Sequence, residues 1–269
     1  MRAKIISPFL KTTGTGKSLT AAHMLHYFAA AGKKVLGIDG DANLTLSSWF
    51  GFDRLDLESS DPSRLTWYDV LVDGRDAREA MVQVRQNNPN LYIIPAAMAL
   101  SNADAETATK ASREFFAIEA LEESGLVNEF DYIIFDSPGN FGIVASSALT
   151  AANYTLMPVN AVGKGMEAID STLDAISQIK RKRVNPNLKN LGLFITRYRS
   201  TTNIDSAVMK FLNEQYGQQP GMFKAALPDS TIFEQAYIGR SSIFETHSKH
   251  KVTAAMTHFM HELEEKLES

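Results

Sequence analysis

The chain of 269 residues contains no cysteine. This absence excludes a disulfide scaffold, a cysteine nucleophile and a thiolate metal site. No hydrophobic run approaches the roughly 18 residues that a membrane-spanning helix needs. No basic segment followed by an apolar one opens the chain, as a signal peptide would require. We therefore expect a soluble, cytoplasmic protein with no membrane partner.

The sequence also lacks internal repeats and any linker rich in proline, glycine or serine. Hydrophobic residues make up 44% of the chain, and a chain of this length can bury a core that needs no disulfide or metal. We expect a single domain over residues 1–269. The formal charge of −4, from 27 Lys+Arg against 31 Asp+Glu, argues against a uniformly basic nucleic-acid binder.

Short apolar runs alternate with helical patterns along the chain. The runs predict strands at residues 4–7, 34–38, 91–95, 132–135, 154–159, 191–196 and 223–227. The helical patterns cover residues 17–31, 107–123, 141–152, 166–183 and 205–216. This alternation predicts an α/β fold, with a mainly parallel, twisted sheet and helices on both faces. Ligands bind at the carboxyl ends of the strands in such sheets.

A glycine-containing loop follows the first predicted strand. Gly14 and Gly16 allow the backbone to turn its N–H groups around a phosphate, and the following helix start adds its positive dipole end. Lys17 is expected to reach the β- and γ-phosphates, and the Ser18 hydroxyl to bind Mg²⁺. The strict motif G-x-x-x-x-G-K-[ST] is not met, because Lys11 replaces its first glycine. The alternative is a lysine-bearing helix cap after a glycine turn.

Two other predicted strands end in carboxylates. Residues 35–38 lead into Asp39 and Asp41, and an apolar strand leads into Asp136, which a Ser-Pro-Gly turn follows. We expect Asp136 to hold Mg²⁺ through water, as a Walker B aspartate does, and Asp39 to support the metal shell. Asp41 is a candidate to orient or deprotonate the attacking water. The alternatives are a solvated turn and a strand-terminal cap.

These motifs, in this order, resemble the ParA/MinD group of deviant Walker A P-loop ATPases, especially small ParA proteins without an N-terminal DNA-binding domain. Further matching stretches cover nearly the whole chain, at residues 66–71, 91–96, 131–139, 154–159, 227–230 and 234–236. The resemblance implies ATP and Mg²⁺ as cofactors. It implies that Gly14, Thr15, Gly16, Lys17, Ser18 and Leu19 contact the nucleotide, and that Arg197, Pro228 and Asp229 lie near its base.

The resemblance also implies a functional cycle. ATP drives formation of a sandwich homodimer that binds DNA nonspecifically. An adaptor or centromere-binding protein then stimulates hydrolysis, and the dimer separates. The expected role is therefore to partition or position a cargo, such as a plasmid, a chromosome locus or a carboxysome, over the nucleoid.

One residue departs from the family pattern. The signature lysine that reaches the partner's nucleotide aligns with Thr12, which has no positive charge. Lys164 and Lys11 are the candidates to replace it, and the third alternative is that no lysine does. A lysine relocated to the position of Lys164 resembles the carboxysome-positioning, McdA-like branch. Without such a lysine, the protein would be a weakly hydrolysing nucleotide switch or scaffold in conjugation or assembly.

Charge is distributed unevenly along the chain. Residues 180–210 hold eight Lys or Arg and one acid, whereas residues 104–136 hold nine acids and two bases. The basic cluster Lys180, Arg181, Lys182 and Arg183 is the candidate for nonspecific contact with DNA phosphates. The alternative is a solvated helix end, where cations suit the helix dipole.

An apolar stripe at helical spacing runs from Val252 to Leu267 near the C-terminus. A MinD-like membrane regulator would use such a helix on lipid, but its last turns are acidic, whereas anionic lipid favours a basic face. We expect this helix to pack on the core. The six histidines form three pairs with i,i+3 spacing and lack an evident third ligand, so we expect them to be packed or solvated.

Overall fold

A single mixed sheet of eight strands organises the part of the chain that the computed structural model describes: residues 2–52, 64–84, 88–160, 164–181, 184–199 and 203–268. The strand order is β3-β4-β2-β5-β1-β6-β7-β8, and every neighbouring pair is parallel except β3 with β4. The strands are β1 (Lys4–Pro8), β2 (Val35–Asp39), β3 (Val82–Gln83), β4 (Leu91–Ile94), β5 (Tyr132–Asp136), β6 (Tyr154–Asn160), β7 (Lys189–Tyr198) and β8 (Met222–Pro228).

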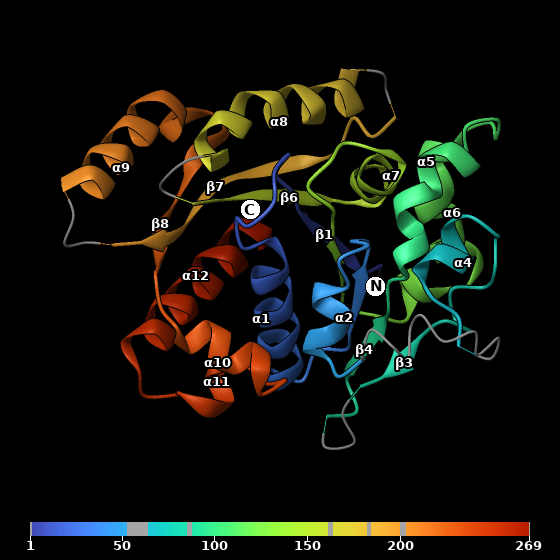
Figure 1. The fold of residues 1–269 in the computed structure, drawn as a ribbon, viewed down its shortest axis with the longest axis horizontal. Coiled ribbons are helices and arrows are strands. Elements are labelled where there is room, and N and C mark those ends of the chain that lie inside the picture. Colours follow the sequence, from blue (N-terminus) through green and yellow to red (C-terminus); the bar gives the residue numbers. More distant parts are fainter. Residues whose placement is uncertain are drawn as a thin grey trace.

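Helices cover both faces of this sheet (Figure 1). One face carries α1 (Lys17–Ala30), α2 (Thr45–Trp49), α10 (Ile232–Ile238), α11 (Ile243–Thr246) and α12 (Lys251–Glu268). The other carries α4 (Trp67–Leu71), α5 (Ala103–Glu106), α6 (Phe116–Glu123), α7 (Ile143–Ala151), α8 (Lys164–Arg181) and α9 (Asn203–Tyr216). Short turns η1 (Met98–Asn102), η2 (Arg113–Phe115), η3 (Leu126–Asn128) and η4 (Gly217–Gly221) connect them. The α/β fold predicted from the sequence is confirmed.

Strand β5 explains why the apolar runs are nearly continuous. Ile133 and Phe135 face the cluster under α4 to α9, while Ile134 faces the cluster under α1 and α12. All three are at most 1% exposed. A parallel strand covered on both faces has no solvent side, so it does not alternate with polar residues.

The predicted helix at residues 107–123 is largely wrong. Its regular part is only α6, which follows a set of turns and η2. Ser112 adopts a positive φ of 53°, which an α-helix does not allow. Thr107 donates its hydroxyl to the carbonyl of Ala103, and the hydroxyl-rich segment that follows favours such local bonds over helix continuation. The two-residue strand β3 had no sequence signal.

Helix α12 packs against the sheet, as predicted. The residues of its apolar stripe are at most 3% exposed: Val252, Met256, Phe259, Met260, Leu263 and Leu267. The ring of Phe259 stacks on that of Phe194 in β7, with centroids 3.8 Å apart, and also contacts Phe223 in β8. The apolar face that a lipid surface would need is therefore already occupied. None of the helices in the described ranges is long and apolar enough to cross a membrane.

We expect Phe259→Ala to lower the free energy of unfolding by about 3–5 kcal/mol, because it leaves a cavity between α12 and two strands. Urea denaturation followed by circular dichroism measures this loss. The control is Phe211→Ala in α9, whose side chain is 47% exposed and should cost less than about 1 kcal/mol. Equal effects of the two substitutions would contradict the packing described for α12.

Candidate functional site

The loop between β1 and α1 adopts a conformation that depends on glycine. Gly14 and Gly16 have φ values of 73° and 93°, in the left-handed region. Gly16 is also the N-cap of α1, with no side chain bonded to the helix end and no acidic residue in its first turn. The first N–H groups of α1 are thus available to an anion, with the helix dipole favouring negative charge.

Lys17 lies at the start of α1, only 6% exposed. Its Nζ donates hydrogen bonds to the carbonyl oxygens of Thr12 at 2.5 Å and of Leu10 at 3.4 Å. Burial lowers the pKa of Lys17, and the negative charges of Asp136 and Asp41 oppose that shift. The ammonium group is therefore held inside the loop by backbone carbonyls that a phosphate can replace.

Asp39 and Asp136 lie side by side because β2 and β5 pair in register at these two residues. Both side chains are fully buried. Asp39 accepts hydrogen bonds from the N–H and hydroxyl of Ser47, each at 2.7 Å, and from the N–H of Asp41 at 3.0 Å. Burial nevertheless raises the pKa of Asp39 to about 6.

Asp136 lacks such compensation. Neither of its carboxylate oxygens has a hydrogen-bond partner among the described residues. Burial raises the pKa of Asp136 well above its usual range, and the charge of Asp39 adds to the rise. The Ser18 hydroxyl lies close enough to oppose the rise, although no hydrogen bond of good geometry joins the two groups.

This donor set fits Mg²⁺. Orphaned carboxylate oxygens beside a hydroxyl are hard ligands, and a divalent cation would offset the cost of burying them. The described residues contain no cluster of three or more His, Cys, Asp or Glu that could hold a metal by itself. The cation would therefore draw further oxygens from water and phosphate, as Mg²⁺ usually does. The histidine pairs form no such cluster within the described ranges.

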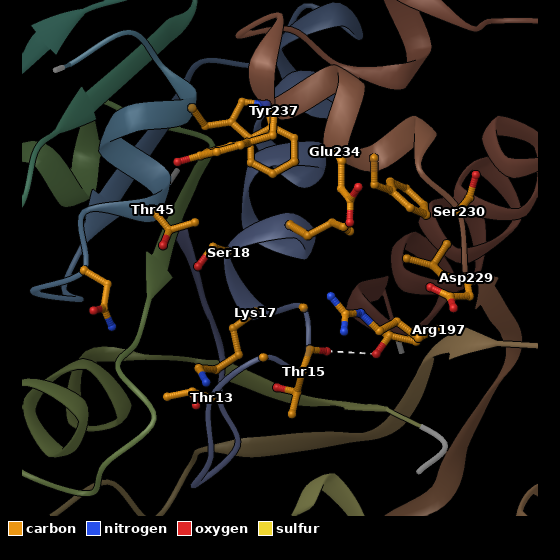
Figure 2. A pocket seen from close by; sticks show the side chains of 18 of the residues that line it. Thr13, Thr15, Lys17, Ser18, Thr45, Arg197, Asp229, Ser230, Glu234 and Tyr237 are labelled. Atoms are coloured by element: carbon orange, nitrogen blue, oxygen red, sulfur yellow. Dashed lines mark hydrogen bonds between the residues drawn. The ribbon is translucent and has the colours of Figure 1, made fainter. Parts of the chain in front are cut away.

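A cavity of about 350 Å³ opens above the loop and is lined by residues from both halves of the chain (Figure 2). It brings together most of the residues singled out in the sequence: Gly14, Thr15, Gly16, Lys17, Ser18, Leu19, Asp41, Arg197, Pro228 and Asp229. Asp41 lies at its mouth, where its Oδ1 accepts hydrogen bonds from the backbone and side-chain nitrogens of Asn43. Asp39 and Asp136 are fully buried and do not line the cavity.

Among the described residues, the remaining candidates do not line the cavity. Lys11 is in the loop but does not line the cavity. Lys164 is the first residue of α8, and its side chain lies outside what the structure describes. Lys180 and Arg181 are exposed in the last turn of α8. Lys182 and Arg183 lie outside the described residues.

An aromatic wall of the cavity escaped the sequence analysis. Trp49, Phe233 and Tyr237 come from α2 and α10 and line the side away from the loop. The rings of Trp49 and Tyr237 lie 5.4 Å apart. No spacing signal links positions so far apart in the chain.

His23 packs against two of the three aromatic residues of this wall. Its fully buried ring makes edge contacts with Trp49 and Phe233, with centroids 5.2 and 5.7 Å away. Its Nδ1 bonds to the carbonyl of Leu19 at 2.8 Å, and its Nε2 accepts the N–H of Ile243. Burial lowers the pKa of His23 to about 4. This histidine is thus packed, as predicted, and neutral.

A glycine loop between a buried strand and a helix, with Lys17 and Ser18 at the helix start and Asp136 at a neighbouring strand end, defines a P-loop nucleotide-binding protein. The comparisons agree. The AAA_31 family, described as an AAA domain, matches residues 3–190. The chain belongs to this family and, within it, to the ParA/MinD group of ATPases, which use ATP and Mg²⁺.

Individual proteins give the same result. The chain is 28% identical over 233 residues to the sporulation initiation inhibitor protein Soj of Bacillus subtilis, with 87% of each chain covered. It is 27% identical over 223 residues to the chromosome partitioning protein ParA of Caulobacter vibrioides, covering 83% of this chain and 79% of that protein. Apo McdA from Cyanothece shares the fold, with a TM-score of 0.85 and 22% identity over 97% of this chain and 99% of that one.

We expect Asp136→Asn to abolish the thermal stabilisation that Mg²⁺ and ATP give, and to lower ATP turnover by at least about a hundredfold, because the cation loses its buried anionic partner. Thermal melts with and without Mg²⁺–ATP, together with phosphate release, measure both effects. Asp131→Asn, just before β5 and away from the loop, is the control. Parental turnover in Asp136→Asn would contradict the assigned role.

The low pKa of His23 predicts a loss of stability in acid. Below pH 6.5 the unfolded chain binds a proton that the folded chain takes up only near pH 4. The contribution of His23 is therefore complete above pH 6.5 and is lost towards pH 4, by roughly 3 kcal/mol. The raised pKa of Asp39 acts in the opposite direction, so the measurement compares unfolding of the parent and His23→Gln across this range.

The stability difference between the parent and His23→Gln should shrink by that amount from pH 7 to pH 4. His258→Gln, which replaces an exposed histidine, is the control and should show a constant difference. A constant difference for His23→Gln as well would rule out a neutral, buried His23.

Proposed function

We propose that this protein is an ATP-dependent dimerising ATPase that binds DNA nonspecifically and, with an adaptor protein, partitions or positions a cargo over the nucleoid in the cytoplasm. The observation that carries the proposal is that Lys17 and Ser18 line one cavity at the carboxyl edge of the sheet, with the buried Asp136 next to Ser18. The relationship to Soj and to ParA, a chromosome partitioning protein by name, supports the partitioning role.

The site residues have distinct roles in the proposed hydrolysis. Lys17 exchanges its carbonyl partners for the β- and γ-phosphates, while the N–H groups of the loop and of α1 enclose them. Ser18, Asp136 and Asp39 are placed to hold Mg²⁺ directly or through water, and the bound cation would neutralise charge that develops on the phosphates. Asp41, at the cavity mouth, orients the attacking water and accepts its proton.

The cavity is also lined by Arg197, Pro228 and Asp229, together with the aromatic wall. Apolar and aromatic surfaces suit the flat faces of a nucleobase, and the polar groups among them fix its orientation. We propose that this part of the cavity holds the adenine, while the loop holds the phosphates.

The proposed dimer needs a positive charge from the partner, and Thr12 cannot supply it. We propose that Lys164, at the start of α8, contributes this charge, with Lys11 as the second candidate. Lys164→Ala should lower ATP turnover at least about tenfold and weaken ATP-dependent dimerisation, because a cation near the transferred phosphate is lost.

Lys11→Ala is the matched comparison and should keep most of the turnover. Phosphate release and light scattering with a slowly hydrolysed ATP analogue measure the two properties. If Lys164→Ala behaves like the parent in both measurements, Lys164 is not the missing lysine.

The end of α8 is the proposed DNA surface, since Lys180 and Arg181 are exposed there. Replacing both by alanine should weaken DNA binding about equally for all sequences and should reduce the slope of log affinity against log salt by about 2. Fluorescence anisotropy over a salt series measures the slope. The double substitution Lys249→Ala with Lys251→Ala removes two exposed cations elsewhere and should leave it unchanged. An unaltered slope for the α8 variant would place the DNA surface elsewhere.

The nature of the cargo separates the remaining possibilities. A plasmid or chromosome locus agrees with the relatives named above, and the McdA-like branch would imply a carboxysome or similar body. The absence of a lysine at Thr12 favours one alternative, a nucleotide switch that hardly hydrolyses ATP. ATP turnover measured with and without DNA and the adaptor decides between a partition ATPase and such a switch. The turnover of a partition ATPase rises with DNA and its adaptor, whereas that of a switch stays slow. A MinD-like membrane role is disfavoured by the buried face of α12.

A further inference from the structure

A buried hydroxyl connects helix α8 to the phosphate loop. Thr172 is fully buried midway along the helix, and its Oγ1 accepts a hydrogen bond from the N–H of Lys11 at 3.0 Å. The same hydroxyl donates to the carbonyl of Ala168 within α8 at 2.6 Å. The other buried side chains described in α8 are apolar: Ala168, Ile169, Ala175, Ile176 and Ile179. A valine would fill about the same volume as Thr172 but has no hydroxyl, so it could not accept the hydrogen bond from the Lys11 N–H.

The loop residue that Thr172 holds lies in a tight turn. The N–H of Thr12 donates to the carbonyl of Leu10 at 2.7 Å, which encloses Lys11 in a three-residue turn. The N–H of Lys11 therefore points out of the turn, and Thr172 supplies the acceptor for this partly buried donor.

One peptide unit of this turn has a partner at each end. The N–H of Lys11 and the carbonyl of Leu10 belong to the same planar group. The N–H donates to Thr172, while the carbonyl accepts from the Thr12 N–H and from Lys17 Nζ. The side chain that is expected to bind phosphate and the side chain that anchors α8 thus act on opposite ends of one rigid unit.

The other side of the turn is closed. A Cβ at Gly139, just after β5, would lie 2.8 Å from the carbonyl carbon and oxygen of Thr12. The backbone of Thr12 therefore packs directly against the turn that follows Asp136, and it has no room to move in that direction. A displacement of the turn is therefore directed away from β5. It is opposed by the hydrogen bond from the Lys11 N–H to Thr172 and by the hydrogen bonds from Lys17 Nζ to the carbonyls of Leu10 and Thr12.

We propose that Thr172 is a positioning residue for the nucleotide loop, and that the peptide unit between Leu10 and Lys11 transmits the position of Lys17 to α8. When Lys17 leaves the carbonyls of Leu10 and Thr12 for a phosphate, the peptide unit loses a cationic partner. Hydrogen bonds in a chain polarise one another. The strength of the hydrogen bond to Thr172, and with it the position of α8 against the loop, therefore changes with nucleotide occupancy.

This connection gives α8 a place in the nucleotide cycle. Thr172 lies eight residues from Lys164 and eight from Lys180, about 12 Å along the axis in each direction. A helix is stiff over this length, so a shift at Thr172 is carried to both ends. The coupling to α8 requires only that the protein binds a nucleotide. The further coupling to a DNA surface rests on the proposed function.

The test compares Thr172→Val, which removes the hydroxyl but keeps the shape, with Thr172→Ser, which keeps the hydroxyl. Ser171→Ala is the control, since the Ser171 hydroxyl donates only to Ala168 within the helix. The measurements are the melting temperature, kcat and KM for ATP, and deuterium exchange of peptides covering α8 with and without Mg²⁺ and a slowly hydrolysed ATP analogue. Thr172→Ala takes the place of the valine variant if that variant does not fold.

We expect the analogue to change exchange in α8 of the parent, of Thr172→Ser and of Ser171→Ala, but not of Thr172→Val. The valine variant should also lose kcat severalfold with less change in KM and a melting temperature close to that of the parent. The proposal would be overturned if Thr172→Val kept both the kcat of the parent and its change in α8 exchange. It would also be overturned if the analogue did not change exchange in α8 of the parent. A parent that shows the response but does not bind DNA would refute the proposed function and leave this coupling intact.

Discussion

The burial of charged groups at the carboxyl edge of the sheet is the constraint on which the rest of the structure depends. Asp39, Asp136 and Lys17 all lie within the protein, and Asp136 has no hydrogen-bond partner among the described residues. Burying ions in this way is costly unless they are paired or bound to a ligand. In the free protein, burial disfavours the charged forms of these groups, so it raises the pKa values of the two carboxyl groups and lowers that of the lysine. Bound Mg²⁺ would offset the charge of the carboxylates, and a phosphate chain would offset that of Lys17.

The fold forms this edge from the ends of neighbouring parallel strands. The parallel strands β2, β5, β1 and β6 end at the same side, so residues far apart in the chain meet there without long-range loops. Close packing then fixes their positions: Thr12 lies against Gly139, and Thr196 donates its hydroxyl to the carbonyl of Thr15 at 2.8 Å. The nucleotide loop is thus held by the segment after β5 on one side and by β7 on the other, and the N–H of Lys11 joins it to α8 through Thr172.

Much of this arrangement could be predicted from the sequence, because local signals carry it. Uninterrupted apolar runs such as that of β5 mark strands covered on both faces, and the aspartates that end β2 and β5 mark the edge. The glycines at 14 and 16 are visible because glycine adopts their left-handed backbone conformation without the steric cost that other residues pay. Contacts made by distant segments give no such signal. The wall of Trp49, Phe233 and Tyr237, the support from His23 and the bond between Lys11 and Thr172 became visible only with the fold.

The most direct test of the buried-charge account is the structure of the protein with Mg²⁺ and a slowly hydrolysed ATP analogue bound. We expect Lys17 Nζ to have left the carbonyls of Leu10 and Thr12 and to lie about 3 Å from a phosphate oxygen. The cation should lie beside Ser18 and Asp136. A bound nucleotide with Lys17 still on those carbonyls and Asp136 still without a cationic partner would contradict it.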